Sequence, residues 1–505
     1  MSTETAASPD RGATGAAIED AEPATRPGRR FPALALPAWS PIEWAGLLIP
    51  MLGLMILGLR DIGAPSLWRD EVSSVIFARG SLADLLTIVG RDRQEVGLAN
   101  MATYYLILHF WLFIGETEGR IRLLSTIFGV LSVVPVYLIA RRLAGWMAGA
   151  LAAAIFVLIP YVIHFSQEAR GYSLAMLIAG AMTWLVLVGV ERRDRVWPWL
   201  AYGVIGALGL YVHFFLALVV AAHGLWVLAT RQVPPLRSAA AAILPLALAA
   251  APLPFIIAEF GGEHGWIPAL TQRRAIIALE KLVGGTWPLL LFSGLVAVAA
   301  VLRRRDSRAW LLIASAVFPI LAAIGISVVK PFFIPRYLVI VLPQLAVVAG
   351  VAVLSLRPVA ARAAVALTVI AVLVLGLPNA YFTPTDINWR AAGRWLAEEV
   401  QPGDHIVMVS WHDSPLEYYF LRFDPPAEPV RLREREALAG VDGRIWLALT
   451  GMRPNAAAEK LGGYLSRYRI EASRSFGRRA QLVLLVPVES ASAAARTTLL
   501  ASAGR

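Results

Sequence analysis

The sequence contains repeated apolar runs of about 20 residues, and this feature limits what the chain can fold into. The runs recur between residues 41 and 377, and short Arg-containing stretches separate many of them. About 20 helical residues cross the hydrocarbon core of a bilayer. Because lipid offers no hydrogen-bond partners, the backbone of each run must be satisfied internally, as in an α-helix. The runs therefore predict a polytopic α-helical membrane protein.

Composition and charge support this class and exclude others. Only 16% of the 505 residues are charged and 58% are hydrophobic, whereas soluble domains carry about 25% charge. The runs lack the alternation of a transmembrane β-barrel. The net charge is +11, but the Arg residues cluster in short loops, as in the positive-inside pattern. Nucleic-acid binding is therefore not expected, and the absence of cysteine excludes disulfides and thiolate metal sites.

The charge pattern also predicts a topology. Arg26, Arg29 and Arg30 precede the first run and place the N-terminus in the cytoplasm. The short aromatic run 102–114 is interpreted as a helix lying in the membrane interface. With that choice the sequence predicts about eleven spans and an extracytoplasmic C-terminus, the spans being 41–59, 121–140, 146–165, 172–190, 197–212, 214–229, 239–258, 288–302, 310–329, 337–356 and 363–377.

Four regions follow from these patterns. We expect a disordered cytoplasmic tail over 1–38, a transmembrane domain over 39–380 with an external loop at 61–120, and a disordered tail over 489–505. Between them, 381–488 has the composition of a soluble domain. An amphipathic helix over 386–400 and apolar strands at 405–409, 445–449 and 481–486 predict a small extracytoplasmic α/β domain.

Asp70 and Glu71 stand side by side just after the first span, in the predicted external loop. A carboxylate there can act as a general base on a hydroxyl. Two adjacent carboxylates can also hold a divalent cation. Alternatively, they cap a short helix that starts near Val72, since acids favour helix N-termini. From the residues alone, capping and catalysis are equally supported.

Basic residues occur on the predicted outer side, against the positive-inside trend. They are Arg120 and Arg122, Arg170 two residues after Glu168, and Lys330 and Arg336. Arg can donate two parallel hydrogen bonds to a phosphate or carboxylate. The clusters therefore suggest an anionic ligand, with snorkelling to lipid phosphates as the alternative.

His213 and His109 lie among aromatic residues, where a histidine is more often structural than catalytic. The sequence contains no zinc-ligand spacing, phosphate-binding loop, dinucleotide fingerprint or serine-hydrolase elbow. The predicted cytoplasmic loops are too short for a nucleotide-binding domain. An activated donor is therefore expected to be a lipid.

The ordered motifs resemble a known family. Ser66-Leu67-Trp68-Arg69-Asp70-Glu71 is similar to the first-loop motif of C-type glycosyltransferases, in the bacterial branch related to glycosyltransferase family 39 that includes protein O-mannosyltransferases and the lipid A aminoarabinose transferase. Further similar segments are 104–111, 120–125, 166–172, 213–215, 335–338 and 388–392, so the resemblance covers about residues 40–430. One departure is Asn100-Met101-Ala102, where the family often has His-Pro-Pro.

This resemblance implies an inverting glycosyltransferase that uses a polyprenyl-phosphate sugar on the outer face of the bacterial inner membrane. The acceptor would be a hydroxyl of a lipid, glycan or protein. Asp70 would be the general base, with Glu71 orienting the acceptor or supporting Asp70. The substrate and donor-phosphate residues would be Arg122, Glu168, Arg170, Tyr172, His213, Lys330, Arg336 and Tyr337, and the acceptor-side residues Asn100, Tyr104, Tyr105 and His109. No cofactor is certain, and Asp70 with Glu71 is the one candidate site for a divalent cation.

Two other functions are compatible with the sequence. A transporter or flippase for an anionic lipid or lipid-linked sugar would need polar residues inside its spans, and the predicted spans contain few. An accessory subunit with a decayed site would explain the missing His-Pro-Pro, but Asp70 and Arg170 are both present.

Overall fold

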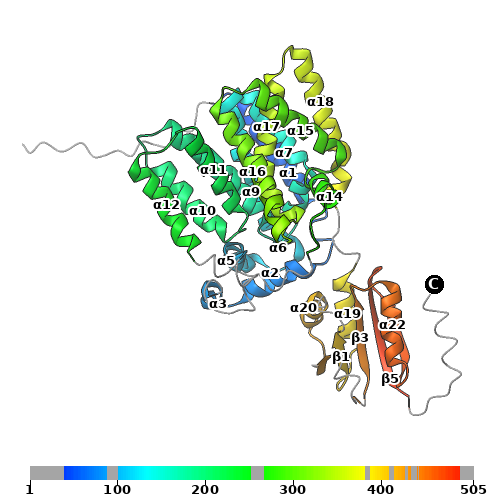
Figure 1. Cartoon of the computed structure of the whole chain (residues 1–505). Helices are drawn as coiled ribbons and strands as arrows, with labels where there is room; N and C mark the ends of the chain where they lie inside the picture. Colours follow the sequence, from blue (N-terminus) through cyan, green and yellow to red (C-terminus); the bar gives the residue numbers. More distant parts are fainter. Residues whose placement is uncertain are drawn as a thin grey trace, which may run out of the picture. The chain divides into compact units, whose positions relative to one another are not determined.

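The computed structural model describes residues 39–87, 100–251, 267–381, 387–408, 414–426, 430–433, 441 and 443–488. The predicted tails at 1–38 and 489–505 lie outside the described residues, as does 88–99 of the predicted external loop. The described part of the chain from 41 to 381 is helical (Figure 1).

The helices of this part follow one another with short connections. They are α1 (Pro41–Leu59), α2 (Arg69–Arg79), α3 (Leu82–Thr87), α5 (Ala102–Trp111), η1 (Leu112–Ile114), α6 (Glu118–Ala144), α7 (Trp146–Leu158), α8 (Pro160–Ser166), α9 (Tyr172–Glu191), α10 (Trp197–Leu210), α11 (Leu216–Ala229), α12 (Leu236–Ala250), α14 (Gln272–Val283), α15 (Thr286–Leu302), α16 (Ser307–Val329), η3 (Pro335–Val341), α17 (Leu342–Ser355), α18 (Val359–Gly376) and η4 (Leu377–Tyr381).

The chain is a multi-pass membrane protein, but the predicted count of eleven spans is not confirmed. Among the described residues, six helices are long and apolar enough to cross a membrane, or up to eight if each of two bent pairs is one span. Three other predicted spans fall on α10, α11 and α12, which have 14, 14 and 15 residues. At 1.5 Å per residue, each is only about 21–23 Å long. The predicted span 239–258 also runs beyond the described residues.

The two bent pairs have clear chemical causes. α7 and α8 meet at an angle of 66°, where Pro160 starts α8 and cannot donate a helical hydrogen bond. α14 and α15 meet at 86°, where Gly284 and Gly285 have φ of 102° and 137°, a region that favours glycine. The first bend leads into residues 167–171, which carry Glu168 and Arg170.

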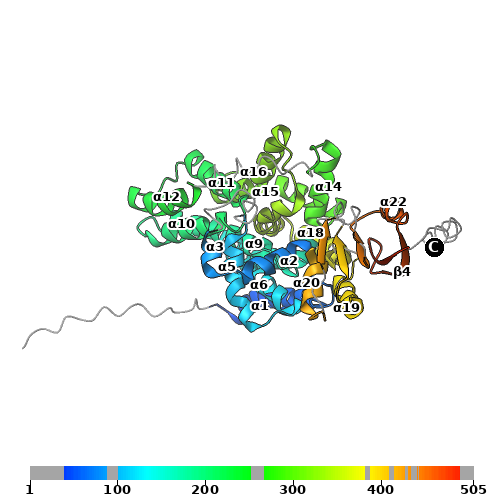
Figure 2. The ribbon, with the colours of Figure 1, turned by 90° about the horizontal axis from the view of Figure 1, so that it is seen from below.

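Burial separates a central group of helices from peripheral ones. Most residues of α6, α9 and α17 are buried, whereas few residues of α1 and α18 are. α10 and α12 pack against each other at one edge of the helical part (Figures 1 and 2). A spanning helix with exposed apolar side chains can face lipid, so α1 and α18 have the composition of lipid-facing helices.

One buried polar network lies within the helical part. Thr183 of α9 hydrogen-bonds to His223 of α11 at 3.1 Å, and His223 also bonds to Tyr202 of α10 at 3.2 Å. Gln344 of α17 donates to Thr183 at 2.9 Å. Hydrogen bonds between helices stabilise packing in a membrane. The network therefore joins the short helices α10 and α11 to the centre of the bundle.

The described residues from 387 onward form a sheet covered by helices. The elements are α19 (Trp389–Glu399), β1 (His405–Met408), α20 (Ser414–Arg422), β2 (Val430–Arg433), β3 (Ile445–Thr450), α22 (Pro454–Tyr464), β4 (Tyr468–Ser475) and β5 (Ala480–Pro487). The strand order is β2-β1-β3-β5-β4. β1 is parallel to β2 and β3, whereas β5 is antiparallel to β3 and β4.

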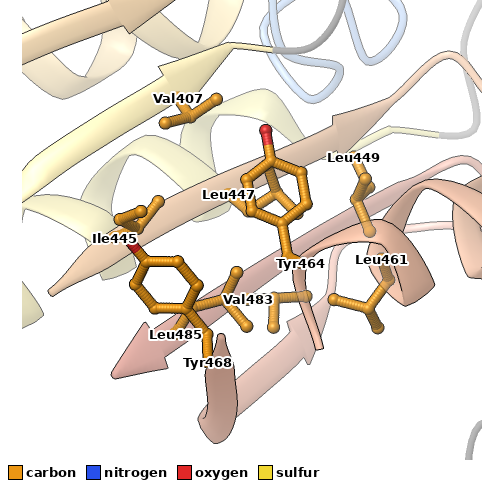
Figure 3. Packing of buried hydrophobic residues seen from close by; sticks show 9 residues of the cluster. All are labelled: Val407, Ile445, Leu447, Leu449, Leu461, Tyr464, Tyr468, Val483 and Leu485. Atoms are coloured by element: carbon orange, nitrogen blue, oxygen red, sulfur yellow. The ribbon is translucent and has the colours of Figure 1, made fainter. Parts of the chain in front are cut away.

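The two faces of the sheet follow from the alternation of side chains in β3. Ile445, Leu447 and Leu449 pack against Leu461 and Tyr464 of α22 (Figure 3). On the opposite face, Trp446 makes an edge-on contact with Trp395 of α19, with ring centroids 5.2 Å apart. β3 is therefore buried on both faces, and α19 and α20 pack together.

Candidate active site

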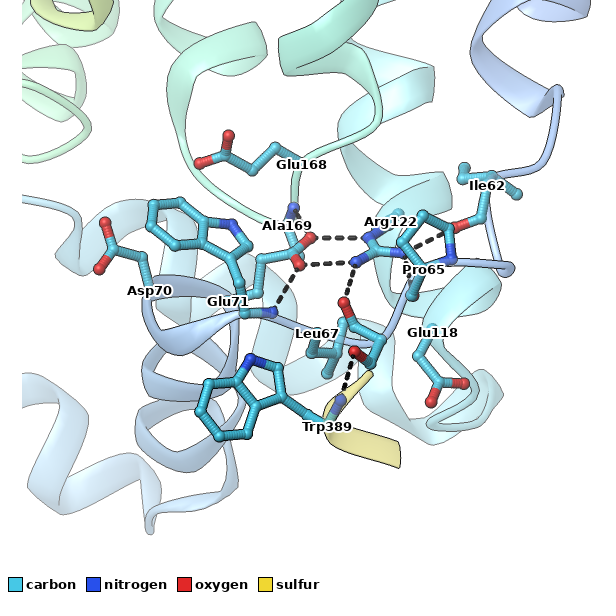
Figure 4. A network of polar contacts seen from close by, with 12 residues as sticks. Ile62, Pro65, Leu67, Asp70, Glu71, Glu118, Arg122, Glu168, Ala169 and Trp389 are labelled. Atoms are coloured by element: carbon cyan, nitrogen blue, oxygen red, sulfur yellow. Dashed lines mark hydrogen bonds and ion pairs between the residues drawn. The ribbon is translucent and has the colours of Figure 1, made fainter. Parts of the chain in front are cut away.

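The first turn of α2 carries the two adjacent acids. Trp68 precedes the helix, and Asp70 and Glu71 lie in its first turn, where the helix dipole favours negative charge. Successive helical residues point about 100° apart. Figure 4 accordingly shows Glu71 facing Arg122, whereas the carboxylate of Asp70 points away from it.

Glu71 is buried and fully hydrogen-bonded. Its side chain is 1% exposed, and it accepts two hydrogen bonds of 2.7 Å from the guanidinium of Arg122. It also accepts from the backbone N–H groups of Ala169 at 2.9 Å and Trp68 at 3.2 Å. The bond to Trp68 is that of an N-terminal helix cap. For Glu71, capping therefore describes the geometry better than catalysis.

All N–H donors of the Arg122 guanidinium are likewise engaged in hydrogen bonds. Besides its two bonds to Glu71, it donates to three carbonyl oxygens in the segment before α2. These are Ile62 and Pro65 at 2.9 and 2.8 Å from Nη1, and Ser66 at 3.1 Å from Nη2. A guanidinium has five N–H donors, and these contacts use all five. The structure thus corrects the expectation that Arg122 binds donor phosphate, because no donor remains for it.

Asp70 lies in different surroundings. Its side chain is 20% exposed, and its Oδ2 lies 3.4 Å from Nη1 of Arg336. Its backbone carbonyl accepts from Ser74 Oγ at 3.0 Å and from Arg170 at 3.3 Å. The main chain of Asp70 is thus fixed while its carboxylate stays accessible. This is the arrangement that a general base requires.

Arg170 lies behind Asp70, in the connection between α8 and α9. Its Nη1 also donates to the hydroxyl of Tyr105 at 3.0 Å, and its buried Nε has no partner among the described residues. Burial lowers the pKa of Arg170, but Tyr105 and Asp70 raise it more, so the pKa lies well above its ordinary value. Gly171 follows, where a Cβ would lie 3.2 Å from Val212 and 3.4 Å from Tyr104. A glycine therefore allows this connection to pack closely.

Arg336 approaches Asp70 from η3. Its guanidinium lies 6.0 Å from the ring centroid of Trp68 and 5.8 Å from that of Tyr337, within range of cation–π attraction. Its Nε is buried and has no partner within the described part of the chain. Arg170, at the main-chain carbonyl of Asp70, and Arg336, at its carboxylate, therefore bring two charged groups with unused donors to one residue.

Aromatic rings form a wall beside Arg336. The ring of His213 lies 4.9 Å from that of Tyr337 and 5.9 Å from that of Tyr172. His213 Nδ1 accepts from the N–H of Phe215 at 3.3 Å, which places the ring proton on Nε2. Burial, and then the charges of Arg170 and Arg336, lower the pKa of His213 to about 3. His213 is therefore neutral near pH 7.

The remaining predicted residues are not brought together at Asp70. Asn100 accepts from the N–H of Phe214 at 2.8 Å, Tyr104 hydrogen-bonds to Ser125 at 2.9 Å, and His109 bonds to the carbonyl of Ala78 at 2.8 Å. Lys330 follows the end of α16, and no ion pair of its side chain occurs among the described residues. Tyr105 is the acceptor-side candidate that reaches Arg170.

A cavity of about 950 Å³ lies beside Trp68 and Glu71. Its lining includes Trp68, Glu71, Arg122 and Glu168, together with residues of η4 and of the segment before α2. Glu168 is 5% exposed, with Oε2 3.5 Å from Nε2 of His164. Glu168 Oε1 and the indole N–H of Trp68 are buried without partners among the described residues. The lining of the cavity is therefore partly polar and includes the carboxylate side chains of Glu71 and Glu168.

The chain resembles known proteins in sequence and in fold. Residues 99–257 match the family model of dolichyl-phosphate-mannose-protein mannosyltransferases. The fold is similar to that of ArnT from Cupriavidus metallidurans bound to undecaprenyl phosphate (TM-score 0.59, 15% identity), over 88% of this chain and 98% of that one. It is also similar to the archaeal oligosaccharyltransferase AglB from Archaeoglobus fulgidus, in complex with an inhibitory peptide and a dolichol-phosphate (TM-score 0.52, 12% identity), over 89% of this chain and 76% of that one. No curated protein matches the chain.

The matching segment and the similar fold both support the resemblance, stated above from the sequence motifs, to C-type glycosyltransferases of the group that includes ArnT and the mannosyltransferases. The matched segment 99–257 contains Arg122, Glu168, Arg170 and His213, whereas Asp70 and Arg336 lie outside it. The roles of individual residues are therefore inferred from their geometry in this structure.

Two long-range contacts in the structure were not predicted from the sequence. Gln167 donates to the carbonyls of Leu57, Gly58 and Arg60 at 3.3, 3.1 and 2.7 Å, and so ties the end of α1 to the Glu168–Arg170 segment. Tyr419 bonds to the segment before α2 from more than 300 residues away in the sequence. Both contacts depend on long-range packing, which periodicity does not reveal.

The geometry of Asp70 and Glu71 gives little support to a metal ion shared by the two carboxylates. The described residues contain no group of three or more His, Cys, Asp or Glu side chains that could hold one. Asp70 and Glu71, the predicted candidates, point apart, and each faces an Arg. A cation shared by both carboxylates would have to displace Arg122 from Glu71.

Proposed function

We propose that the protein is an inverting glycosyltransferase that moves a sugar from a polyprenyl-phosphate donor to an acceptor hydroxyl. The acceptor would belong to a lipid, glycan or protein. The reaction would occur on the outer face of the bacterial inner membrane, with the N-terminus cytoplasmic and the α/β domain extracytoplasmic. The observation that supports this most is the placement of Asp70, whose accessible carboxylate faces Arg336 and whose main-chain carbonyl accepts from Arg170.

Asp70 is the proposed general base. It would accept the proton of the acceptor hydroxyl as that oxygen attacks the anomeric carbon of the donor sugar. The bond between this carbon and the phosphate oxygen breaks, the electron pair goes to that oxygen, and polyprenyl phosphate leaves. Attack from the side opposite the phosphate inverts the anomeric configuration. The fixed main chain of Asp70 favours such a geometry because the carboxylate is held in place before the substrate arrives.

Arg170 and Arg336 are the proposed ligands of the donor phosphate. Donors fixed in a partly buried site stabilise charge that develops on a leaving group. Arg336 has a loose contact of 3.4 Å with Asp70, which an arriving phosphate can replace. The neutral rings of Tyr172, His213 and Tyr337 would surround the phosphate and limit its access to water. Lys330 remains a predicted ligand without a contact in its support.

A polar part of the substrate other than the phosphate is assigned to the cavity beside Trp68. Sugar hydroxyls both donate and accept hydrogen bonds, which fits polar residues of the lining such as Gln167 and Glu168. A carboxylate repels phosphate, so Glu168 is assigned to a sugar and not to the phosphate. The volume of about 950 Å³ is large enough for a monosaccharide. Asp70, Arg170 and Arg336 are not part of this lining, so the reacting carbon would lie outside the cavity.

The experiment is to supply the full chain in lipid nanodiscs with a panel of undecaprenyl-phosphate sugars and a cell-envelope extract as acceptor. Release of undecaprenyl phosphate, measured by mass spectrometry, does not require the acceptor to be known. We expect release with at least one donor. Absence of release with every donor, together with movement of undecaprenyl phosphate across a bilayer, would instead favour a transporter.

A further inference from the structure

The segment before α2 is held from the side of the α/β domain as well as from α6. The hydroxyl of Ser66 donates to the carbonyl of Ile387 at 3.3 Å and accepts from the N–H of Trp389 at 3.1 Å. Arg390 donates to the carbonyl of Gly63 at 3.0 Å. Residues at the start of α19 thus fix the path of the chain that leads to Asp70.

Tyr419 of α20 makes the contact nearest to Asp70. Its hydroxyl accepts a hydrogen bond of 2.7 Å from the backbone N–H of Leu67 and donates one of 2.9 Å to Glu118 Oε1. Leu67 and Tyr419 are both completely buried. Water therefore cannot replace the hydroxyl without a rearrangement of the packing.

Glu118 orients this hydroxyl. It is 8% exposed, and its Oε1 also accepts from Nε of Arg390 at 2.8 Å. A charged acceptor makes the bond from Tyr419 stronger than a neutral one. Because the hydroxyl proton points to Glu118, the oxygen lone pairs of Tyr419 face the N–H of Leu67.

We propose that Tyr419 is a positioning residue through which the α/β domain sets the place of Asp70. This rests on the proposed role of Asp70 as general base. Leu67 lies one residue before Trp68, where α2 begins, and three before Asp70. Removing the hydroxyl of Tyr419 frees the Leu67 amide and lets the first turn of α2 shift relative to Arg336. The Glu71–Arg122 pair still anchors that turn, so the protein folds without the hydroxyl.

The experiment compares Tyr419→Phe with Tyr418→Phe in the full chain in lipid nanodiscs. The neighbouring hydroxyl of Tyr418 accepts from Arg422 at 3.4 Å and serves as the matched control. Hydrogen–deuterium exchange of a peptide covering Leu67 should become faster in Tyr419→Phe and stay unchanged in Tyr418→Phe. The kcat for undecaprenyl phosphate release should fall about tenfold to a hundredfold in Tyr419→Phe, with KM for the donor within about twofold because the phosphate ligands are intact.

Each outcome decides one claim. Equal exchange and equal kcat in the two variants would overturn the positioning role. If the wild type releases no undecaprenyl phosphate, the proposed function fails, and exchange at Leu67 alone then decides whether Tyr419 holds this segment. If Tyr419→Phe does not fold, Glu118→Ala keeps the ring of Tyr419 and removes the acceptor that orients it. Faster exchange at Leu67 in that variant supports the proposal, and unchanged exchange overturns it.

Discussion

Asp70 and Glu71 are neighbours in sequence, but their surroundings differ in almost every respect. Glu71 is buried, bound by the guanidinium of Arg122 and by two backbone N–H groups. Asp70 is partly exposed and faces Arg336 at 3.4 Å. The difference shows that a carboxylate with all its hydrogen-bonding capacity occupied stabilises the site, whereas a carboxylate with free acceptors is available for chemistry. Two guanidiniums show the same contrast, since Arg122 uses all its donors and Arg336 does not.

Substitutions in the buried Glu71–Arg122 pair should have the largest effect on stability. Arg122→Ala leaves the charge of Glu71 buried without its partner, which costs about 3–5 kcal/mol. We expect a low folded yield and a much lower unfolding temperature in detergent. The control is Arg141→Ala, which breaks the partly exposed pair with Glu43 and should cost about 1 kcal/mol or less. Equal stability of the two variants would contradict a special stabilising role of the Glu71–Arg122 pair.

Substitution of Arg336, which faces Asp70, should affect ligand binding more than stability. Arg336→Ala removes a charged hydrogen-bond donor worth about 1.5–3 kcal/mol, so the Kd for undecaprenyl phosphate should rise about tenfold to a hundredfold. Lys330→Ala should change the Kd by less than about twofold, since no contact places Lys330 at the site. Native mass spectrometry in nanodiscs measures both constants. A larger effect at Lys330 than at Arg336 would move the phosphate site toward α16.

The smallest effect concerns His213 and pH. His213 lies in the turn between α10 and α11, with its pKa lowered to about 3. Between pH 6.5, its ordinary value, and about 3, the unfolded chain binds a proton that the folded chain does not. Stability should therefore fall as pH falls, by about 2 kcal/mol from pH 6.5 to 5. His213→Phe should flatten this part of the unfolding profile, and an unchanged slope would contradict a neutral His213.

Much of this arrangement could be predicted from the sequence because it depends on local pattern. Apolar runs predict helices in a membrane, and the order of short motifs indicates the resemblance to C-type glycosyltransferases. The charge pattern also singled out Arg170 and Arg336, which the structure brings to Asp70. The count of spans was less predictable, because α10, α11 and α12 are apolar but short. Hydropathy shows that a segment is apolar but does not fix the length of the helix that it forms.

Pairing over long distances could not be predicted. Glu71 and Arg122 are 51 residues apart, and the charge rule treats Arg122 and Arg336 as equivalent cations. The rule cannot distinguish an Arg with five occupied donors from one with a free donor. Tyr419 is a further case, because one tyrosine in a short amphipathic helix has no pattern that marks it.

The most direct measurement compares Asp70→Asn with Glu71→Gln for both unfolding temperature and undecaprenyl phosphate release in nanodiscs. We expect Asp70→Asn to keep its stability within about 1 kcal/mol and to lose release by about a hundredfold or more. Glu71→Gln should unfold at a clearly lower temperature, because its amide opposes the donors of Arg122. Substantial release by Asp70→Asn, or a stable Glu71→Gln that loses release as completely, would contradict the division of roles between the two acids.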